Sequence, residues 1–129
     1  MPLLLDTTVL IDALRGSAAR QRILDLRRGG EVPYVCAVNV DEVARGVRPD
    51  EHRLTRDLID SLRWAPLGAD QGWCAGTWRG EFAAQGVTLS QADCLVAAAA
   101  VGIGGRLATG NPDDFPMTGL VVEHWPVGD

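Results

Sequence analysis

Short apolar runs recur along this chain and alternate with segments in which apolar residues fall every three or four positions. The runs predict buried strands at residues 3–6, 32–37, 64–67, 106–109 and 120–124. The helical spacing predicts helices at 7–14, from a cap at Ser17 to Gly29, at 39–45, 49–62, 70–85 and 90–101, and a helical turn at 112–115. This alternation favours a single α/β domain over residues 1–129, with a mainly parallel sheet between helix layers.

Acidic residues lie where several of the predicted helices begin, namely Asp6, Glu42, Asp93 and Asp114. Helices that return to a parallel sheet begin at the carboxyl edge of its strands, where such folds place their sites. Carboxylates that meet at one edge repel each other unless a cation lies between them. The pattern therefore predicts a divalent metal site.

Helix capping is the alternative explanation for each acid taken alone. Ser90 and Asp93 have the spacing of a capping box, Asn39 and Glu42 form a close variant of it, and Asp6 suits a plain N-cap. Capping does not explain why the acids follow apolar strands in a regular order. The whole set therefore favours the metal site.

Oxygen ligands without histidine or cysteine are typical of Mg²⁺ or Mn²⁺ rather than zinc or iron. Such a site indicates phosphate-ester chemistry, in which the ion activates water and neutralises charge on the phosphoryl oxygens. The residues alone leave phosphomonoesterase and nuclease both open.

Composition narrows the remaining classes. The 129 residues are 47% hydrophobic and 22% charged, with a net charge of −5, as in an ordinary globular domain. All 12 basic residues are arginines, and the absence of lysine excludes a P-loop. No run of about 20 apolar residues predicts a membrane span, and the start of the chain reads as a buried strand rather than a signal peptide. The scattered Cys36, Cys74 and Cys94 suit a reducing compartment, so we expect a cytoplasmic protein.

Four segments, in order, resemble the motifs of PIN-domain ribonucleases, especially the VapC toxins of VapBC toxin–antitoxin pairs. They are Leu4-Leu5-Asp6-Thr7-Thr8-Val9-Leu10-Ile11-Asp12, Asn39-Val40-Asp41-Glu42-Val43-Ala44-Arg45-Gly46, Gln91-Ala92-Asp93-Cys94-Leu95-Val96-Ala97-Ala98-Ala99 and Leu107-Ala108-Thr109-Gly110-Asn111-Pro112-Asp113-Asp114-Phe115. Any one of them is weakly specific, whereas the ordered set covers essentially the whole chain. Two positions depart from the usual pattern: Asn39 replaces Ser or Thr, and Gly110 replaces a frequent arginine.

The resemblance implies a three-layer α/β/α fold and metal-dependent endoribonuclease activity. It implies that Asp6, Glu42 and Asp93 hold Mg²⁺ or Mn²⁺, with Asp114 preferred over Asn111 and Asp113 as the fourth acidic position. Supporting roles are expected for Thr7, Asn39, Thr109 and Asn111, and phosphate contacts for Arg15 and Arg45. We assign Asp12 and Asp41, which neighbour the motifs, to the solvated surface.

The resemblance also implies partners: an RNA substrate, a VapB-like antitoxin and a second copy of the chain in a homodimer. We expect the antitoxin tail to cover the helix that carries Trp73 and Trp78. Two alternatives stay open from the sequence. One is a PIN-like nuclease of RNA processing without an antitoxin, and the other is a non-catalytic module that binds RNA or protein.

Overall fold

The computed structural model describes residues 1–16 and 18–128. Its elements in chain order are β1 (Leu3–Leu5), α1 (Thr7–Leu14), α2 (Ala18–Arg28), β2 (Tyr34–Val35), α3 (Ala37–Gly46), η1 (Pro49–Glu51), α4 (His52–Asp60), β3 (Arg63–Trp64), α5 (Ala69–Ala84), α6 (Gln91–Gly102), β4 (Arg106–Thr109), η2 (Pro112–Asp114) and β5 (Val121–His124). Each predicted helix and strand has a counterpart in this order, and the predicted cap at Ser17 lies outside the described residues.

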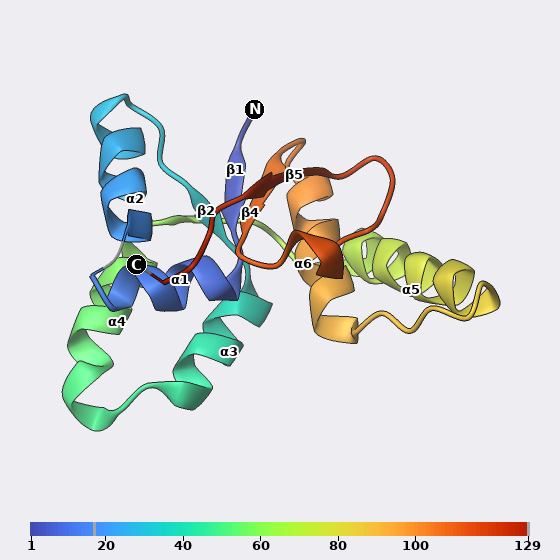
Figure 1. Cartoon of the computed structure of the whole chain (residues 1–129), viewed down its shortest axis with the longest axis horizontal. Helices are drawn as coiled ribbons and strands as arrows, with labels where there is room; N and C mark the ends of the chain where they lie inside the picture. The colour runs from blue at the N-terminus through green and yellow to red at the C-terminus, as the bar shows by residue number, and fades with distance from the viewer. Residues whose placement is uncertain (17, 129) are drawn as a thin grey trace.

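The strands form one five-stranded sheet in the order β3-β2-β1-β4-β5, and every neighbouring pair is parallel. β1 lies at the centre, so the chain builds one half of the sheet outward from β1 to β3 and then returns to β1's other side with β4 (Figure 1). The predicted parallel α/β arrangement is confirmed.

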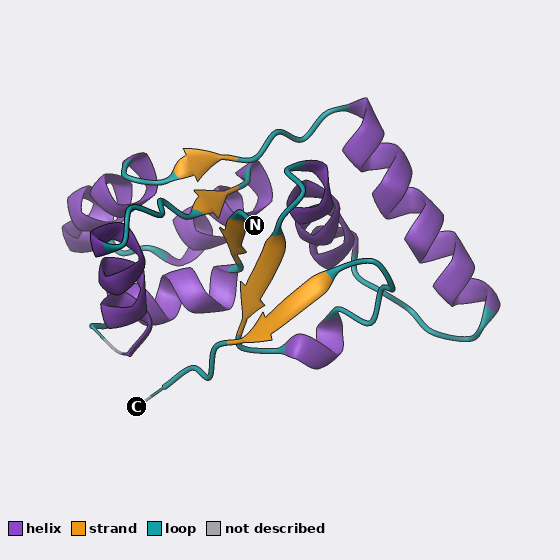
Figure 2. Cartoon of the chain, turned by 90° about the horizontal axis from the view of Figure 1, so that it is seen from above, coloured by secondary structure: helices purple, strands orange, loops and turns teal. Residues whose placement is uncertain are grey.

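Helices cover both faces of this sheet, which gives three layers (Figure 2). Alternate side chains of β1 enter different apolar clusters, because successive residues of a strand point to opposite faces. Leu3 and Leu5 pack with residues of α1, α2, α3 and α4, whereas Leu4 packs with residues of α5 and α6. The residues of α6 from Val96 to Ala100 are all buried, so the prediction of a central apolar helix is confirmed. α5 lies outside α6, and its Trp73 is 82% exposed.

Two boundaries differ from the prediction for one physical reason. β2 spans only Tyr34–Val35, and α3 begins at Ala37 rather than after a cap at Asn39. Asn39 is the third residue of α3, and its Oδ1 accepts a hydrogen bond from the backbone N–H of Cys36 at 3.1 Å. The side chain thus reaches back to the first turn from inside the helix, and Cys36 occupies the N-cap position.

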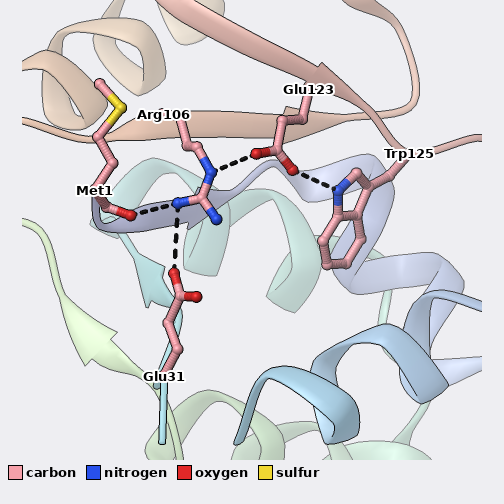
Figure 3. Close-up of polar contacts among 5 residues, drawn as sticks. All are labelled: Met1, Glu31, Arg106, Glu123 and Trp125. Carbon is pink, nitrogen blue, oxygen red and sulfur yellow. Dashed lines mark hydrogen bonds and ion pairs between the residues drawn. The ribbon is translucent and has the colours of Figure 1, made fainter. Parts of the chain in front are cut away.

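A partly buried arginine joins the amino ends of the strands (Figure 3). Arg106, the first residue of β4, donates hydrogen bonds to the carbonyl oxygen of Met1 and to the carboxylates of Glu31 and Glu123. The indole N–H of Trp125 donates to the other oxygen of Glu123 at 3.2 Å. These contacts form one charge network at the end of the sheet away from the acidic motifs. The network joins β4 to β5, to the segment before β2 and to the residues before β1.

Among the described residues, no helix is both long enough and apolar enough to cross a membrane.

Candidate metal site at the carboxyl edge of the sheet

Asp6 directly follows β1 and occupies the N-cap position of α1, but its side chain makes no capping hydrogen bond. The capping alternative is therefore wrong for this residue. Its Oδ2 instead accepts hydrogen bonds from the hydroxyls of Thr109 at 2.7 Å and Thr8 at 3.3 Å. Two hydroxyls on one oxygen fix the rotation of the carboxylate, and Asp6 is only 6% exposed.

The environment of Asp6 disfavours its charge. Burial raises the pKa of this carboxyl, hydrogen bonds from Thr109, the Thr7 backbone and Thr8 oppose that rise, and the charge of Glu42 adds to it. None of the ion pairs formed among the described residues involves Asp6. The ionised form is therefore short of positive charge, as expected of a side chain that binds a cation.

Glu42 is held by a relay between α1 and α3. Asn39 is fully buried and donates from Nδ2 to the hydroxyl oxygen of Thr7 at 3.2 Å, and that hydroxyl donates to Oε1 of Glu42 at 2.6 Å. Asn39 and Glu42 share one face of α3 because they are three residues apart. Glu42 is the sixth residue of α3, so the prediction that it lies where a helix begins is wrong.

Asp93 lies in the first turn of α6, after an N-cap at Ser90 whose hydroxyl accepts from the Asp93 N–H at 3.0 Å. The predicted cap at Ser90 is confirmed. Burial raises the pKa of the Asp93 carboxyl, a side-chain hydrogen bond with Ser90 opposes the rise, and the charges of Asp6, Asp114 and Glu42 add to it. The charges of all three other predicted acids therefore act on the Asp93 carboxyl.

The fourth position is occupied by an exposed side chain whichever residue supplies it. Asp114 ends η2, while Asn111 precedes it and donates its backbone N–H to the Thr109 hydroxyl at 3.1 Å. Asp114 is a residue of this turn whose charge raises the pKa of Asp93. The choice of Asp114 over Asn111 and Asp113 as the fourth acid stays a prediction, which this effect on the pKa of Asp93 supports.

The four acids approach each other without forming a closed ligand cage. No group of three or more His, Cys, Asp or Glu side chains within residues 1–16 and 18–128 is placed to hold a metal ion as it stands. Their oxygen-only chemistry and their mutual repulsion nevertheless fit a hard divalent cation. Binding such an ion would require side-chain rotations, for which the exposed Asp114 has room.

Thr8 and Asp12 have roles that the sequence did not reveal. The Thr8 hydroxyl accepts from the Gly110 N–H at 3.0 Å while it donates to Asp6. Asp12, predicted at the solvated surface, is only 6% exposed, and its Oδ1 accepts from the Gly128 N–H at 2.9 Å. That prediction is wrong because the C-terminal segment folds back over α1. Asp41 is exposed, as predicted.

The same C-terminal segment explains the glycine at position 110. A Cβ there would lie 2.6 Å from Cγ1 of Val127 and 3.3 Å from the Thr8 hydroxyl oxygen. A larger residue at position 110 fits only if the Val127 side chain moves. Packing therefore favours glycine here over the arginine that the motif frequently has at this position. Arg15 and Arg45, the predicted phosphate contacts, are both exposed, and that role stays a prediction.

Comparisons with known proteins agree with this geometry. A family model described as PIN domain matches residues 3–118. Ribonuclease VapC19 of Mycobacterium tuberculosis is 28% identical over 115 residues, which cover 88% of this chain and 92% of that protein. VapBC2 from Rickettsia felis, bound to a DNA fragment from its promoter, superposes with a TM-score of 0.82 at 20% identity over 97% of this chain and 99% of that one. A toxin–antitoxin complex from Klebsiella pneumoniae gives a TM-score of 0.78 at 23% identity, again over 97% and 99%. At these identities, the solved structures establish the fold.

Proposed function

The chain belongs to the PIN-domain family, and we propose that it is a Mg²⁺- or Mn²⁺-dependent endoribonuclease and the toxin of a toxin–antitoxin pair. The observation that carries this proposal is that the charges of Asp6, Asp114 and Glu42 all raise the pKa of Asp93, as expected of acids that gather at one edge of the sheet. The relative named as a ribonuclease and the similar toxin–antitoxin complexes support it. We further propose that it acts in the cytoplasm.

Asp6, Glu42, Asp93 and Asp114 would hold the metal. When bound, the ion supplies a more acidic water and neutralises charge on the phosphoryl oxygens. The remaining chemistry belongs to the chain. Burial of Asp6 and Asp93 keeps two carboxylates poorly solvated, so that a cation binds more strongly there than at an exposed acid.

Hydroxyl and amide side chains orient the acids. Thr109 and Thr8 hold Asp6 through one oxygen, and Thr7, itself held by Asn39, holds Glu42. These bonds restrict carboxylates that come from β1 and α3, elements far apart in sequence. Arg15 and Arg45 would then bind phosphates of the RNA on either side of the reacting one, because a guanidinium matches the geometry of a phosphate.

The test is cleavage of single-stranded RNA by the purified protein. We expect cleavage with Mg²⁺ or Mn²⁺, none in EDTA, and none by Asp6→Asn, Glu42→Gln or Asp93→Asn. Mn²⁺ should also raise the melting temperature of the wild type, since a ligand of the folded state stabilises it. Cleavage that survives thorough chelation would overturn the proposed site. A folded wild type that binds RNA without cleaving it would favour the non-catalytic module.

The toxin role has a separate test. Expression of the wild type alone should arrest growth, and Asp6→Asn should be harmless while it still binds the proposed partner, a small VapB-like antitoxin. Co-expression with that antitoxin should restore growth, and light scattering of the purified toxin should show the proposed homodimer. A wild type that cleaves RNA yet is harmless at high level, with no partner recovered, would instead indicate an RNA-processing nuclease.

A further inference from the structure

A hollow of about 180 Å³ opens beside Glu42, between α1, α3, η1 and α4. Part of its wall is aliphatic, formed by Ile11 and Leu14 of α1 and by Val43 and Val47 at α3. The rest is polar and comes from Arg15, Glu42, Glu51 and Thr55. The hollow therefore adjoins one acid of the proposed metal site, Glu42, and none of the hydrogen bonds that organise the acids requires it.

We infer that this hollow is a subsite for one unpaired pyrimidine base of the RNA, next to the phosphate that is cleaved. The inference rests on the proposed ribonuclease activity and adds to it the place of the neighbouring nucleotide. When an RNA strand places a phosphate at Glu42, the base of the adjoining nucleotide must lie next to that residue. The hollow is a recess with aliphatic and polar walls that Glu42 itself lines.

Size and chemistry favour a single flat ring. A cavity of about 150 Å³ holds one six-membered aromatic ring, and this hollow is slightly larger at about 180 Å³. Aliphatic walls suit the faces of a base, and the guanidinium of Arg15 offers a plane on which a base can stack. The Glu51 carboxylate can accept from a base N–H, as carboxylates do from the amino group of cytosine.

Gly46 indicates that the space is kept open. It is the last residue of α3 and lines the hollow, and a Cβ added there would meet no heavy atom within 4 Å. Its φ does not lie in the left-handed region where glycine is favoured. Neither backbone conformation nor packing within the described chain therefore requires glycine at this position. A side chain at this position would occupy open space at the edge of the hollow, and its Cβ would displace no neighbour.

The experiment combines Gly46→Ala and Gly46→Val with RNA oligonucleotides in which each base in turn is removed. Gly76→Ala is the matched control, because a Cβ there also meets nothing within 4 Å and Gly76 does not line the hollow. Removal of the base next to the cut should lower kcat/KM of the wild type at least tenfold. Gly46→Val should cause a similar loss on the intact RNA, with a smaller loss for Gly46→Ala.

The two changes together should cost little more than either alone, because they remove the same interaction. The wild type should also prefer a pyrimidine to a purine at that nucleotide, and Gly46→Val should lose the preference. Additive losses, or no effect of any single base removal, would overturn the subsite.

Binding of the same oligonucleotides in EDTA, measured by fluorescence anisotropy, separates this inference from the activity. A non-additive binding cycle in EDTA, together with no cleavage of the same oligonucleotides when Mg²⁺ or Mn²⁺ is supplied, would overturn the ribonuclease proposal and leave the subsite standing. Cleavage combined with an additive binding cycle would overturn the subsite and leave the ribonuclease proposal standing. If Gly46→Val abolishes binding of a partner peptide and changes nothing on RNA, the hollow is a protein-binding site and the inference is wrong.

Discussion

The buried carboxylate of Asp6 is held by hydroxyl groups and, within the part of the chain described, by no arginine. Its hydrogen bonds compensate part of the loss of water, and burial still raises its pKa. Burial also raises the pKa of Asp93, and the charges of three acidic neighbours add to that rise. Both residues should therefore destabilise the metal-free fold at neutral pH, which is opposite to what a helix cap would do.

We expect Asp6→Asn and Asp93→Asn to raise the free energy of unfolding in EDTA at pH 7. A pKa raised in the folded state means that the stabilising, protonated form is fully present below the ordinary value of 3.8 and is lost as the pH rises through the folded value. The advantage of asparagine should therefore shrink as the pH falls and vanish below about pH 3.8. Urea unfolding at several pH values measures it, with Asp41→Asn as the exposed control. A loss of about 0.5–2 kcal/mol at pH 7 would instead indicate capping.

Between elements, the site depends on contacts that only the folded chain reveals. The acids Asp6 and Asp93 could be predicted from the sequence, because each follows or precedes a strongly patterned segment. The start of α3 could not be predicted from the sequence. Asn39 caps the helix from inside its first turn, and a cysteine occupies the N-cap position. The roles of Thr8 and Asp12 could not be predicted either, because they depend on the return of a C-terminal segment more than 100 residues away in sequence.

The junction of α6 with β4 gives a prediction at this scale. A Cβ on Gly105 would lie 2.6 Å from the carbonyl oxygen of Pro2, which accepts the Arg106 N–H at 2.8 Å where β4 pairs beside β1. Gly105→Ala must separate these strands, so we expect a loss of about 1–3 kcal/mol. Gly76→Ala has open space in α5 and should gain up to about 1 kcal/mol from helix propensity. Urea unfolding of both variants measures the difference, and equal stabilities would contradict the packing at Gly105.

At the scale of the whole molecule, two of the places where apolar surface is exposed differ in shape. α5 presents Trp73, 82% exposed, on the outside of the domain. A hollow of about 440 Å³ between α1, α2 and α4 is rimmed by Leu24 and Leu54, 42% and 56% exposed. A concave surface can surround an inserted apolar side chain, whereas a convex helix contacts it on one side only. If an antitoxin binds this chain, the hollow is therefore the better anchor, although the sequence suggested the helix of Trp73.

We expect Leu54→Glu to weaken binding of the proposed antitoxin at least tenfold, because it places a charge where an apolar side chain would be buried. Trp73→Ala should leave the affinity within about twofold, and RNA cleavage by either variant should equal that of the wild type, since neither residue lies at the acidic edge. Titration calorimetry of each variant with the antitoxin, together with the cleavage assay, gives the answer. Loss of binding in Trp73→Ala with none in Leu54→Glu would place the antitoxin on α5 and contradict the choice of the hollow. Loss of cleavage in Leu54→Glu would show instead that the substitution disturbs the fold, and the smaller Leu24→Ala would then decide.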